Sequence, residues 1–365
     1  MGASRAVQRL KATYAFLKTP IIVSAPMRVF AGPDLAVATS RAGGLGFIGP
    51  GVRPTDLDSK LDKARSLLDQ TPITAPNPTS LNAPDVDRLP IGVGFQLFDG
   101  DLEVAATIVR KHKPAAAWLF VPVSGQSELD QWSLRIRKES PSTKIWIQIG
   151  SVADAVAAAK SKHAPDVLVV QGIDAGGHGL RKGAGVISLL PEVADALQAL
   201  GSEIPLVGAG GIADGRGVAA VLATGVAAGA VMGTRFLASR EAEIKKGYQD
   251  DVLRVSDGGQ STIRTDLFDR LQGRDDWPTQ YDGRAIINRS VKDDLAGMDL
   301  GQNKQIFQEQ IKNGSIGWGE DGRMTAYVGS AVGLVSAVDP AREILERSRA
   351  EARQALRQAL DGLEA

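Results

Sequence analysis

The chain has 365 residues, with 42 Lys plus Arg against 42 Asp plus Glu, so its formal net charge is zero. No global field favours nucleic acid, and no apolar run reaches the roughly 18 residues that suggest a membrane span. The absence of cysteine excludes thiolate nucleophiles and disulfides, and three histidines make a metal site unexpected, so an organic cofactor is the favoured source of chemistry.

The N-terminal segment carries basic residues but no acid before Asp34, which is typical of a transit peptide. Its apolar residues, however, fall on one helical face: Ala6, Leu10, Tyr14 and Leu17. The segment also runs into the first predicted strand without a linker. We therefore expect a helix that caps a barrel and a cytoplasmic protein, with an organelle as the alternative.

Short apolar runs alternate with helical stretches along the chain, as in βα units of a parallel sheet. The predicted strands are Ile21–Ala25, Gly44–Ile48, Ile91–Phe95, Ala116–Val121, Ile145–Ile149, Val167–Gln171, Pro205–Gly208 and Gly229–Met232. The predicted helices are Asp34–Ala42, Asp56–Leu68, Leu102–Lys111, Glu128–Lys138, Val152–Ser161, Leu189–Leu200 and Gly215–Ala223. Eight such units predict a (β/α)₈ barrel. The alternative, a doubly wound open sheet, needs a phosphate-binding fingerprint after the first strand, where Pro-Met-Arg-Val-Phe stands instead.

The pattern changes after residue 240. Residues 1–240 are expected to form the barrel, 241–324 an inserted and mostly helical lid, and 325–365 the last barrel helix with a tail. The last helix is expected to follow Gly329–Leu334. The charged segment Pro340–Ala365 is interpreted as a solvated surface helix, with an oligomer contact as the alternative, and the Pro-rich residues 71–90 as a surface loop.

Active sites of such barrels lie at the C-terminal ends of the strands, so residues after each apolar run are candidates. Gly208–Gly215 follows the seventh predicted strand, and Met232-Gly233-Thr234-Arg235 follows the eighth. Glycine lets backbone N–H groups approach a phosphate, and a helix N-terminus adds a favourable dipole. Glycine at a turn also serves backbone geometry alone, but two such loops at these positions favour a phosphate site.

The segment Gln171–Gly179 follows the sixth predicted strand and holds His178 among glycines. A close-approach loop of this kind places an imidazole over a bound ligand, where it can accept or donate a proton near neutral pH. His178 is therefore the predicted catalytic residue. His112 and His163 have polar neighbours and are interpreted as surface residues.

Other candidates near strand ends are polar or soft side chains. Ala25-Pro26-Met27 would place an apolar side chain against a flat ring, and Gln96 and Gln148 are amides in apolar runs that need hydrogen-bond partners. Met27 as ordinary core, and mutual or backbone bonding of the glutamines, are equally good interpretations. Trp318 and Tyr327 at the end of the lid are hypothesised to line the substrate pocket.

The order of these motifs resembles the nitronate monooxygenase family, formerly called 2-nitropropane dioxygenases, over nearly the whole chain. The motifs are Ala25-Pro26-Met27, Ala42-Gly43-Gly44-Leu45-Gly46, Gln171–Gly179, Gly208–Gly211 and Met232-Gly233-Thr234. Asp174-Ala175-Gly176-Gly177-His178-Gly179 and Ser256–Thr262 resemble the fungal branch most.

The resemblance implies an enzyme that binds FMN without a metal and oxidises alkyl nitronates, or nitroalkanes, with O₂ to carbonyl compounds and nitrite. It implies that His178 deprotonates a nitroalkane or hydrogen-bonds the nitronate, and that Gly210, Gly211, Gly233 and Thr234 hold the phosphate. The residues expected around the cofactor are Ala25, Pro26, Met27, Gln96, Gln148, Gln171, Gly172, Ala175, Gly176, Gly177, Ala209, Gly210, Gly211, Met232, Gly233 and Thr234.

Two alternatives stay open. The same scaffold resembles an enoyl-acyl-carrier-protein reductase that uses NAD(P)H, and a flavin-binding protein without turnover is the other. The expected partners are a small nitronate and O₂, with no nucleic acid and no membrane; oligomeric state is not predicted.

Overall fold

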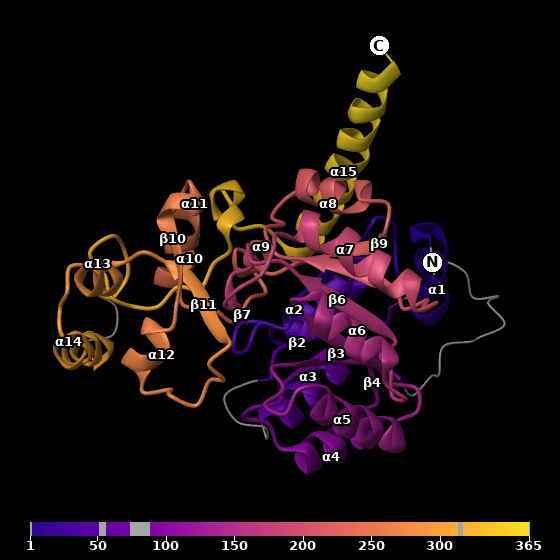
Figure 1. Cartoon of the computed structure of the whole chain (residues 1–365), viewed down its shortest axis with the longest axis horizontal. Helices are drawn as coiled ribbons and strands as arrows, with labels where there is room; N and C mark the ends of the chain where they lie inside the picture. The colour runs from indigo at the N-terminus through magenta and orange to yellow at the C-terminus, as the bar shows by residue number, and fades with distance from the viewer. Residues whose placement is uncertain (1, 51–55, 74–87, 313–316, 365) are drawn as a thin grey trace.

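A computed structural model gives the structure of the chain and describes residues 2–50, 56–73, 88–312 and 317–364. Within these ranges, eight parallel strands close into a barrel that helices surround (Figure 1). In barrel order the strands are β1 (Ile21–Ser24), β2 (Leu45–Ile48), β3 (Leu89–Gln96), β4 (Pro114–Phe120), β5 (Lys144–Ile149), β6 (Val167–Gln171), β8 (Leu206–Ala209) and β9 (Ala227–Met232). The helices that follow them are α2 (Pro33–Arg41), α3 (Asp56–Gln70), α4 (Leu102–His112), α5 (Gln126–Glu139), α6 (Val152–Lys160), α7 (Val186–Ala199), α8 (Gly215–Ala223) and α15 (Ala341–Glu364).

The predicted barrel is confirmed. Its seam is closed by parallel pairing of β1 with β9, which places Val23 beside Val231, so the open-sheet alternative is excluded. The predicted bounds of these strands, and of the helices α2 to α8, differ from the observed ones by at most three residues at either end. Short apolar runs were a sound signal because parallel strands are buried on both faces.

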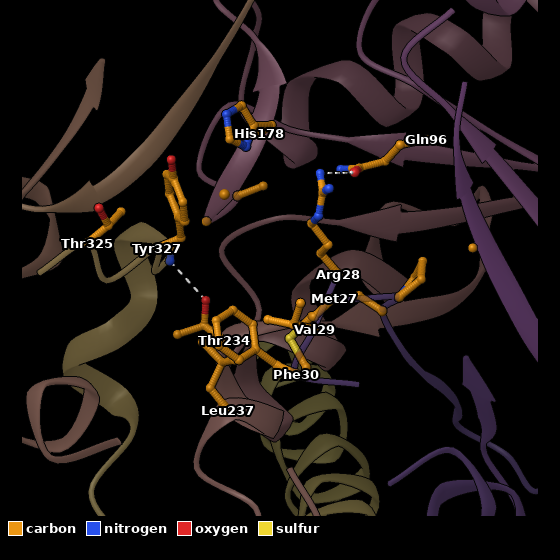
Figure 2. A pocket seen from close by; sticks show the side chains of 18 of the residues that line it. Met27, Arg28, Val29, Phe30, Gln96, His178, Thr234, Leu237, Thr325 and Tyr327 are labelled. Carbon is orange, nitrogen blue, oxygen red and sulfur yellow. Dashed lines mark hydrogen bonds between the residues drawn. The ribbon is translucent and has the colours of Figure 1, made fainter. Parts of the chain in front are cut away.

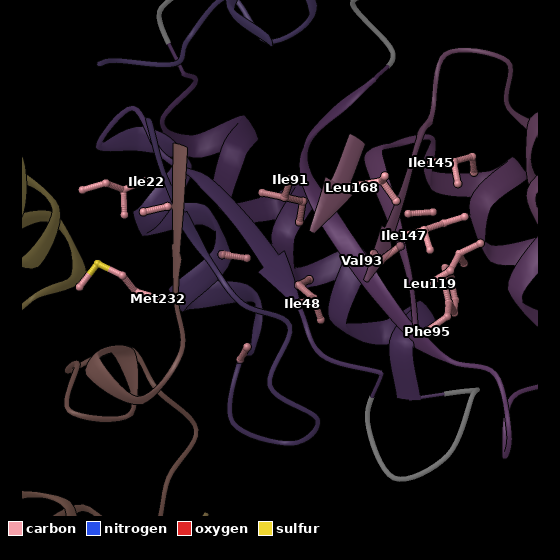
Figure 3. Packing of buried hydrophobic residues seen from close by; sticks show 14 of the residues in the cluster. Ile22, Ile48, Ile91, Val93, Phe95, Leu119, Ile145, Ile147, Leu168 and Met232 are labelled. Carbon is pink, nitrogen blue, oxygen red and sulfur yellow. The ribbon is translucent and has the colours of Figure 1, made fainter. Parts of the chain in front are cut away.

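Alternate residues of each strand face opposite sides of the barrel wall. Ile21 and Val23 of β1 belong to the cluster inside the barrel, which also holds Trp118 and Trp146. Ile22 of β1 belongs to the cluster between the strands and the outer helices, part of which Figure 3 shows. This alternation decides which side chains at the strand ends can reach a ligand in the barrel mouth.

The N-terminal helix α1 (Ala3–Thr13) closes the opposite end of the barrel. Ala6 and Leu10 pack with the interior cluster, and the buried Tyr14 hydroxyl accepts a hydrogen bond from Trp146 Nε1 at 2.9 Å. The capping helix predicted from this apolar face is therefore present.

The interpretation of the C-terminal segment as a solvated helix is wrong for its first half. Helix α15 is itself the last barrel helix, and it packs on α8 and α2 through Ile344, Leu345 and Ala352. Arg349, also buried, donates hydrogen bonds to the carbonyls of Ala42 (2.8 Å) and Gly43 (2.7 Å). This narrow apolar face of α15 was not recognised from the sequence because charged residues surround it there. The last helix does follow Gly329–Leu334, as predicted: that segment holds the short 3₁₀ helix η2 (Ser330–Leu334), and α15 begins beyond it at Ala341.

Between β9 and α15 the chain forms the lid, beside the barrel in Figure 1. Its helices are α9 (Thr234–Leu237), α10 (Lys246–Arg254), α11 (Gly258–Ser261), α12 (Leu267–Gln272), α13 (Arg289–Leu295) and α14 (Leu300–Lys312). Helices make up most of the regular secondary structure in the described part of the lid, as predicted. In the described part of the chain the lid also carries an unpredicted antiparallel sheet in the order β10 (Thr262–Thr265), β11 (Tyr281–Ile286) and β7 (Gly177–Leu180).

His112 is not a surface residue. It is 1% exposed at the end of α4, and its Nε2 lies 2.7 Å from Asp58 Oδ1 of α3. The polar sequence around it is explained by this pairing of two neighbouring helices. The predicted Pro-rich surface loop falls largely on residues 74–87, outside the described residues.

Candidate active site

A cavity of about 950 Å³ lies where the C-terminal ends of the barrel strands meet the lid. A volume of this size is typical of sites that enclose a cofactor or a drug-sized ligand. All of the predicted site residues line it except Gly172 and Met232. Figure 2 shows that its wall is shared: Gln96 comes from the barrel, whereas Thr325 and Tyr327 come from the return of the lid.

Three glutamines lie at or next to the ends of barrel strands: Gln96 ends β3, Gln171 ends β6, and Gln148 is the last residue but one of β5. Gln96, Gln148 and Gln171 share the inward parity of their strands and line the cavity. Gln148 Oε1 accepts a hydrogen bond from Trp118 Nε1 at 3.0 Å, but its Nε2 is buried with no hydrogen-bond partner in the described structure. A buried amide donor without a partner costs about 1–3 kcal/mol, so this atom fits a ligand that offers an acceptor.

The alternation of inward-facing and outward-facing residues along each strand also explains why Gly172 and Met232 do not line the cavity. Met232 has the outward register of β9, is fully buried, and packs with Ile22 among the outer helices (Figure 3). Gly172 follows Gln171 on the outward side, where a Cβ would collide with the backbone of Val186 in α7. Neither residue lines the cavity, although both are next to residues that do, and their contact with a cofactor stays a prediction.

The glycine-rich side of the cavity is the part that the sequence predicts as a phosphate site. Gly210 (φ +97°) and Gly211 (φ +72°) adopt conformations that favour glycine. A Cβ on Gly233 would meet Ala25 Cβ at 3.7 Å and nothing nearer outside its chain neighbours, so its backbone is open to the cavity. Thr234 Oγ1 accepts a hydrogen bond from Gly329 N at 2.9 Å (Figure 2).

The N-terminus of α8 was predicted to contribute to this phosphate site, but its N–H groups already bind a side chain. The Asp214 carboxylate accepts hydrogen bonds from the N–H groups of Arg216 and Gly217, both at 3.0 Å. These are the donors that a free helix end would present to a phosphate. The N-terminus of α8 is therefore capped by its own chain, and the N–H groups of Arg216 and Gly217 are not free donors.

His178 lies in strand β7, not in the predicted loop. β7 pairs antiparallel with β11, which places His178 opposite Gly283. The glycines around it keep their close-approach role: a Cβ on Gly176 would collide with the Gly329 backbone, and one on Gly179 would lie 2.5 Å from Gln171 Oε1. The histidine thus belongs to the sheet of the lid and projects into the cavity.

Two residues that the sequence did not indicate hold the imidazole of His178. Its Nε2 lies 2.9 Å from Asp269 Oδ2 of α12. The indole of Trp277 stacks on its face, with ring centroids 3.6 Å apart and planes 3° apart. Trp277 Nε1 is buried and has no hydrogen-bond partner among the described residues. Trp277 could have been noticed in the sequence, because a tryptophan is unusual in an otherwise polar lid. Asp269 could not, because acidic residues are common on exposed helices.

Arg28 and Arg274 bring the barrel and the lid together at the cavity. Both guanidinium groups bind Asp99 Oδ2, at 3.2 Å and 3.1 Å, and Arg28 also donates to Gln96 Oε1 at 3.1 Å (Figure 2). Burial, and then the charge of Arg274, lower the pKa of Arg28. Asp99 is therefore the counter-ion that keeps the two cations close. Arg28 follows Ala25-Pro26-Met27 directly, so its place after β1 was a signal available in the sequence.

Trp318 and Tyr327 both line the cavity, as hypothesised. The Tyr327 ring centroid lies 5.1 Å from that of His178, and its hydroxyl donates to Asp269 Oδ1 at 3.3 Å. Burial, and then the charge of Asp269, raise the pKa of Tyr327 well above its usual range. The phenol is thus protonated near neutral pH and can act as a donor.

A closed barrel whose strand ends and lid enclose a ligand-sized cavity, with a carboxylate-paired histidine inside it, defines a (β/α)₈-barrel enzyme that acts on a small molecule.

Comparisons with known proteins specify the class further. The nitronate monooxygenase family matches residues 11–347. The nitronate monooxygenase npaC of Metarhizium robertsii is 52% identical over 96% of this chain and 95% of its own length. A nitronate monooxygenase of Neurospora crassa is 35% identical over 98% of this chain and 95% of its own. The chain therefore belongs to the nitronate monooxygenase family, and it is an oxidoreductase.

Solved structures agree on the fold. FabK from Thermotoga maritima superposes with a TM-score of 0.72 at 23% identity, covering 97% of this chain and 98% of its own. A nitroalkane oxidase from Streptomyces ansochromogenes gives a TM-score of 0.70 at 22% identity over 96% and 99% of the two chains. In the described ranges, no helix combines the length and apolar character that crossing a membrane requires.

Proposed function

We propose that this protein binds FMN and oxidises alkyl nitronates with O₂ to carbonyl compounds and nitrite. The observation that supports this most is His178, held in the cavity by Asp269 and Trp277, in a chain 52% identical to a nitronate monooxygenase. Neutral nitroalkanes are a second substrate class under this proposal, since an imidazole can remove the proton that converts them to nitronates.

The residues of the cavity fit FMN at two points. The open backbone of Gly210, Gly211 and Gly233, with Thr234, would hold its phosphate. The unpartnered Gln148 Nε2 would donate to an acceptor on the edge of the isoalloxazine. FMN supplies the electron transfer to O₂ when bound.

The chain's own residues bind and orient the substrate. His178 would accept the proton of a nitroalkane or donate a hydrogen bond to a nitronate oxygen. The Trp277 N–H, buried beside it, offers a second donor to an anionic oxygen. The lid residues Tyr327 and Trp318 also line the cavity, and the ring of Tyr327 lies beside that of His178.

The test begins with the absorbance spectrum of the purified protein and identification of any chromophore it releases. Nitrite release in air is then measured on 2-nitropropane, a neutral nitroalkane, and on propyl-2-nitronate, for the wild type and for His178→Asn. A flavin spectrum, with nitrite release that falls at least about 100-fold in the variant on a neutral nitroalkane, is expected. A colourless protein that takes up no FMN, or full activity of His178→Asn on both substrates, contradicts the proposal.

Anaerobic mixing with NADH separates the enoyl-reductase alternative. Rapid bleaching of the flavin by NADH, without nitronate oxidation, would favour a reductase. A flavoprotein that is inert toward nitronates and NAD(P)H alike would favour a binding protein without turnover.

The cofactor contact is tested by Gln148→Met. Loss of the Nε2 donor is expected to raise the Kd for FMN about tenfold, measured by quenching of FMN fluorescence on the apoprotein. The melting temperature of the apoprotein, measured alongside, reports the loss of the Trp118 contact. Gln198→Leu on the exposed face of α7 is the control and should leave the Kd unchanged.

A further inference from the structure

The imidazole of His178 is held by neighbours on several sides. Asp269 Oδ2 lies 2.9 Å from Nε2, Trp277 stacks on one ring face, and Tyr327 lies at the ring at a tilt of 53°. Asp269 is 5% exposed, so water screens the pair little. A side chain fixed in this way has one orientation rather than a set of rotamers.

Asp269 is itself oriented by the lid. Its other oxygen, Oδ1, accepts the hydrogen bond from the Tyr327 hydroxyl, and the Tyr327 carbonyl accepts one from the Tyr248 hydroxyl at 2.8 Å. These contacts run from α10 through the return segment to α12. The carboxylate is therefore a built partner of the histidine and not a surface acid that happens to lie near it.

The pairing distinguishes the two ring nitrogens. A carboxylate accepts hydrogen bonds, so Nε2 must carry a proton to bind it. Nδ1 makes no hydrogen bond to any residue in the described part of the chain. In a neutral ring with the proton on Nε2, Nδ1 carries the lone pair.

We propose that Asp269 is a positioning residue that fixes the Nε2–H tautomer of His178 and leaves Nδ1 as its reactive nitrogen. The reaction step rests on the proposed function. The proton on the carbon next to the nitro group passes to Nδ1. The electron pair of that C–H bond becomes the C=N bond of the nitronate, and the π pair of the N=O bond moves onto its oxygen. The imidazolium that forms is stabilised by the Asp269 carboxylate, and its extra proton returns to solvent.

The tautomer is tested without any assay of turnover. The chain has three histidines, so ring ¹⁵N labelling of the FMN-loaded protein gives few signals, and His178→Gln assigns the one of interest. At about pH 8.5, where an ordinary imidazole is neutral, we expect a ring proton on Nε2 of His178, shifted downfield and protected from exchange with water. Asp269→Ala should abolish this protected signal, and the isosteric Asp269→Asn should move it upfield.

A proton on Nδ1, or an unchanged protected Nε2 signal in Asp269→Ala, overturns the positioning role whatever the activity. Asp269→Asn keeps the shape of the side chain, so it decides the question if the alanine variant does not fold.

The kinetic arm compares a neutral nitroalkane with its preformed nitronate. Asp269→Asn is expected to lower kcat/KM at least about 100-fold on the nitroalkane, which must lose a proton, and less than about tenfold on the nitronate. A merely structural defect would lower both alike, and that result would overturn the proposal. Asp266→Asn is the matched control, since Asp266 precedes the same helix and pairs with Arg181 at the surface.

Failure of the proposed function has a different signature. A wild type that is inert toward nitroalkanes and nitronates refutes the function, and the Nε2 proton signal then decides the role of Asp269 by itself.

Discussion

The role of a side chain in this protein depends on the residues that surround it, as two histidines and one glutamine show. His178 and His112 both contact a carboxylate, yet His178 lines the cavity while His112 links two helices of the barrel. Gln148 has one satisfied end and one buried free donor. In each case the residue type was visible in the sequence and its partner was not.

Trp277 carries a prediction at this scale. Trp277→Phe keeps a ring on the face of His178 but removes the buried N–H, so binding of an anionic oxygen should weaken. KM for a nitronate is expected to rise about 10- to 100-fold, the worth of a hydrogen bond to a charged group, with a smaller change in kcat. Steady-state kinetics would show it. Trp132→Phe, in the core away from the cavity, is the control, and an equal effect there would contradict the role of Trp277.

Helices of the barrel are joined by a few specific contacts. The hydrogen bond from His112, and then the one from Lys111, lower the pKa of Asp58 below its ordinary 3.8, which ties α3 to α4. A carboxyl group with a lowered pKa in the folded state adds stability above its unfolded pKa. That stability is lost as pH falls through the folded pKa.

Asp58→Asn should therefore destabilise the protein near pH 7, and the difference from wild type should shrink once the pH falls below 3.8. Because the Asp58 side chain is 43% exposed, the effect should not exceed about 1 kcal/mol. Urea unfolding followed by circular dichroism at pH 7 and near pH 3 measures it. Asp195→Asn, an exposed acid on α7, controls for the loss of one charge; a difference that persists at low pH would refute the assignment.

The packing of α15 on α8 depends on the absence of a side chain at Gly215. A Cβ there would lie 2.6 Å from Ala352 N and from Ser348 O, which are backbone atoms of α15 that cannot turn aside. Gly215→Ala is expected to cost about 1–3 kcal/mol, seen as a lower melting temperature. Gly362→Ala, with nothing within 4 Å of its Cβ, should be neutral or slightly stabilising. Equal melting temperatures of the two variants would contradict this view of the interface.

The whole molecule divides into a barrel and a lid that share one cavity. Asp99 binds Arg28 of the barrel and Arg274 of the lid, and without it two partly buried cations would face each other. Asp99→Ala should therefore loosen the lid and leave the barrel intact.

Hydrogen–deuterium exchange would detect this loosening. Peptides covering residues 262–286 should exchange faster in Asp99→Ala, whereas those of β4 to β6 should not change. Asp34→Ala, which removes an exposed ion pair with Lys63 on the barrel, is the control. Unchanged exchange in the lid peptides would show that Asp99 does not hold the two parts together.

The barrel was predictable because its signals are local. An apolar run such as Val167–Gln171 is buried on both faces by any closed parallel sheet, whichever strands lie beside it, and glycine loops such as Gly208–Gly211 follow from backbone geometry. The candidate residues at strand ends gathered in one cavity for the same reason, since parallel strands end at the same rim.

What the tertiary structure decided were the contacts between distant segments. The pairing of His178 with Asp269 joins residues 91 apart in the chain, and the sheet that carries His178 takes two of its strands from the lid. The register of β9 turns Met232 toward the outer helices and away from the cavity. The apolar face of α15 could be identified only once its packing on α8 was known. A linear sequence shows which side chains are available, but hydrogen bonds and burial depend on three-dimensional neighbours, which only the closed fold supplies.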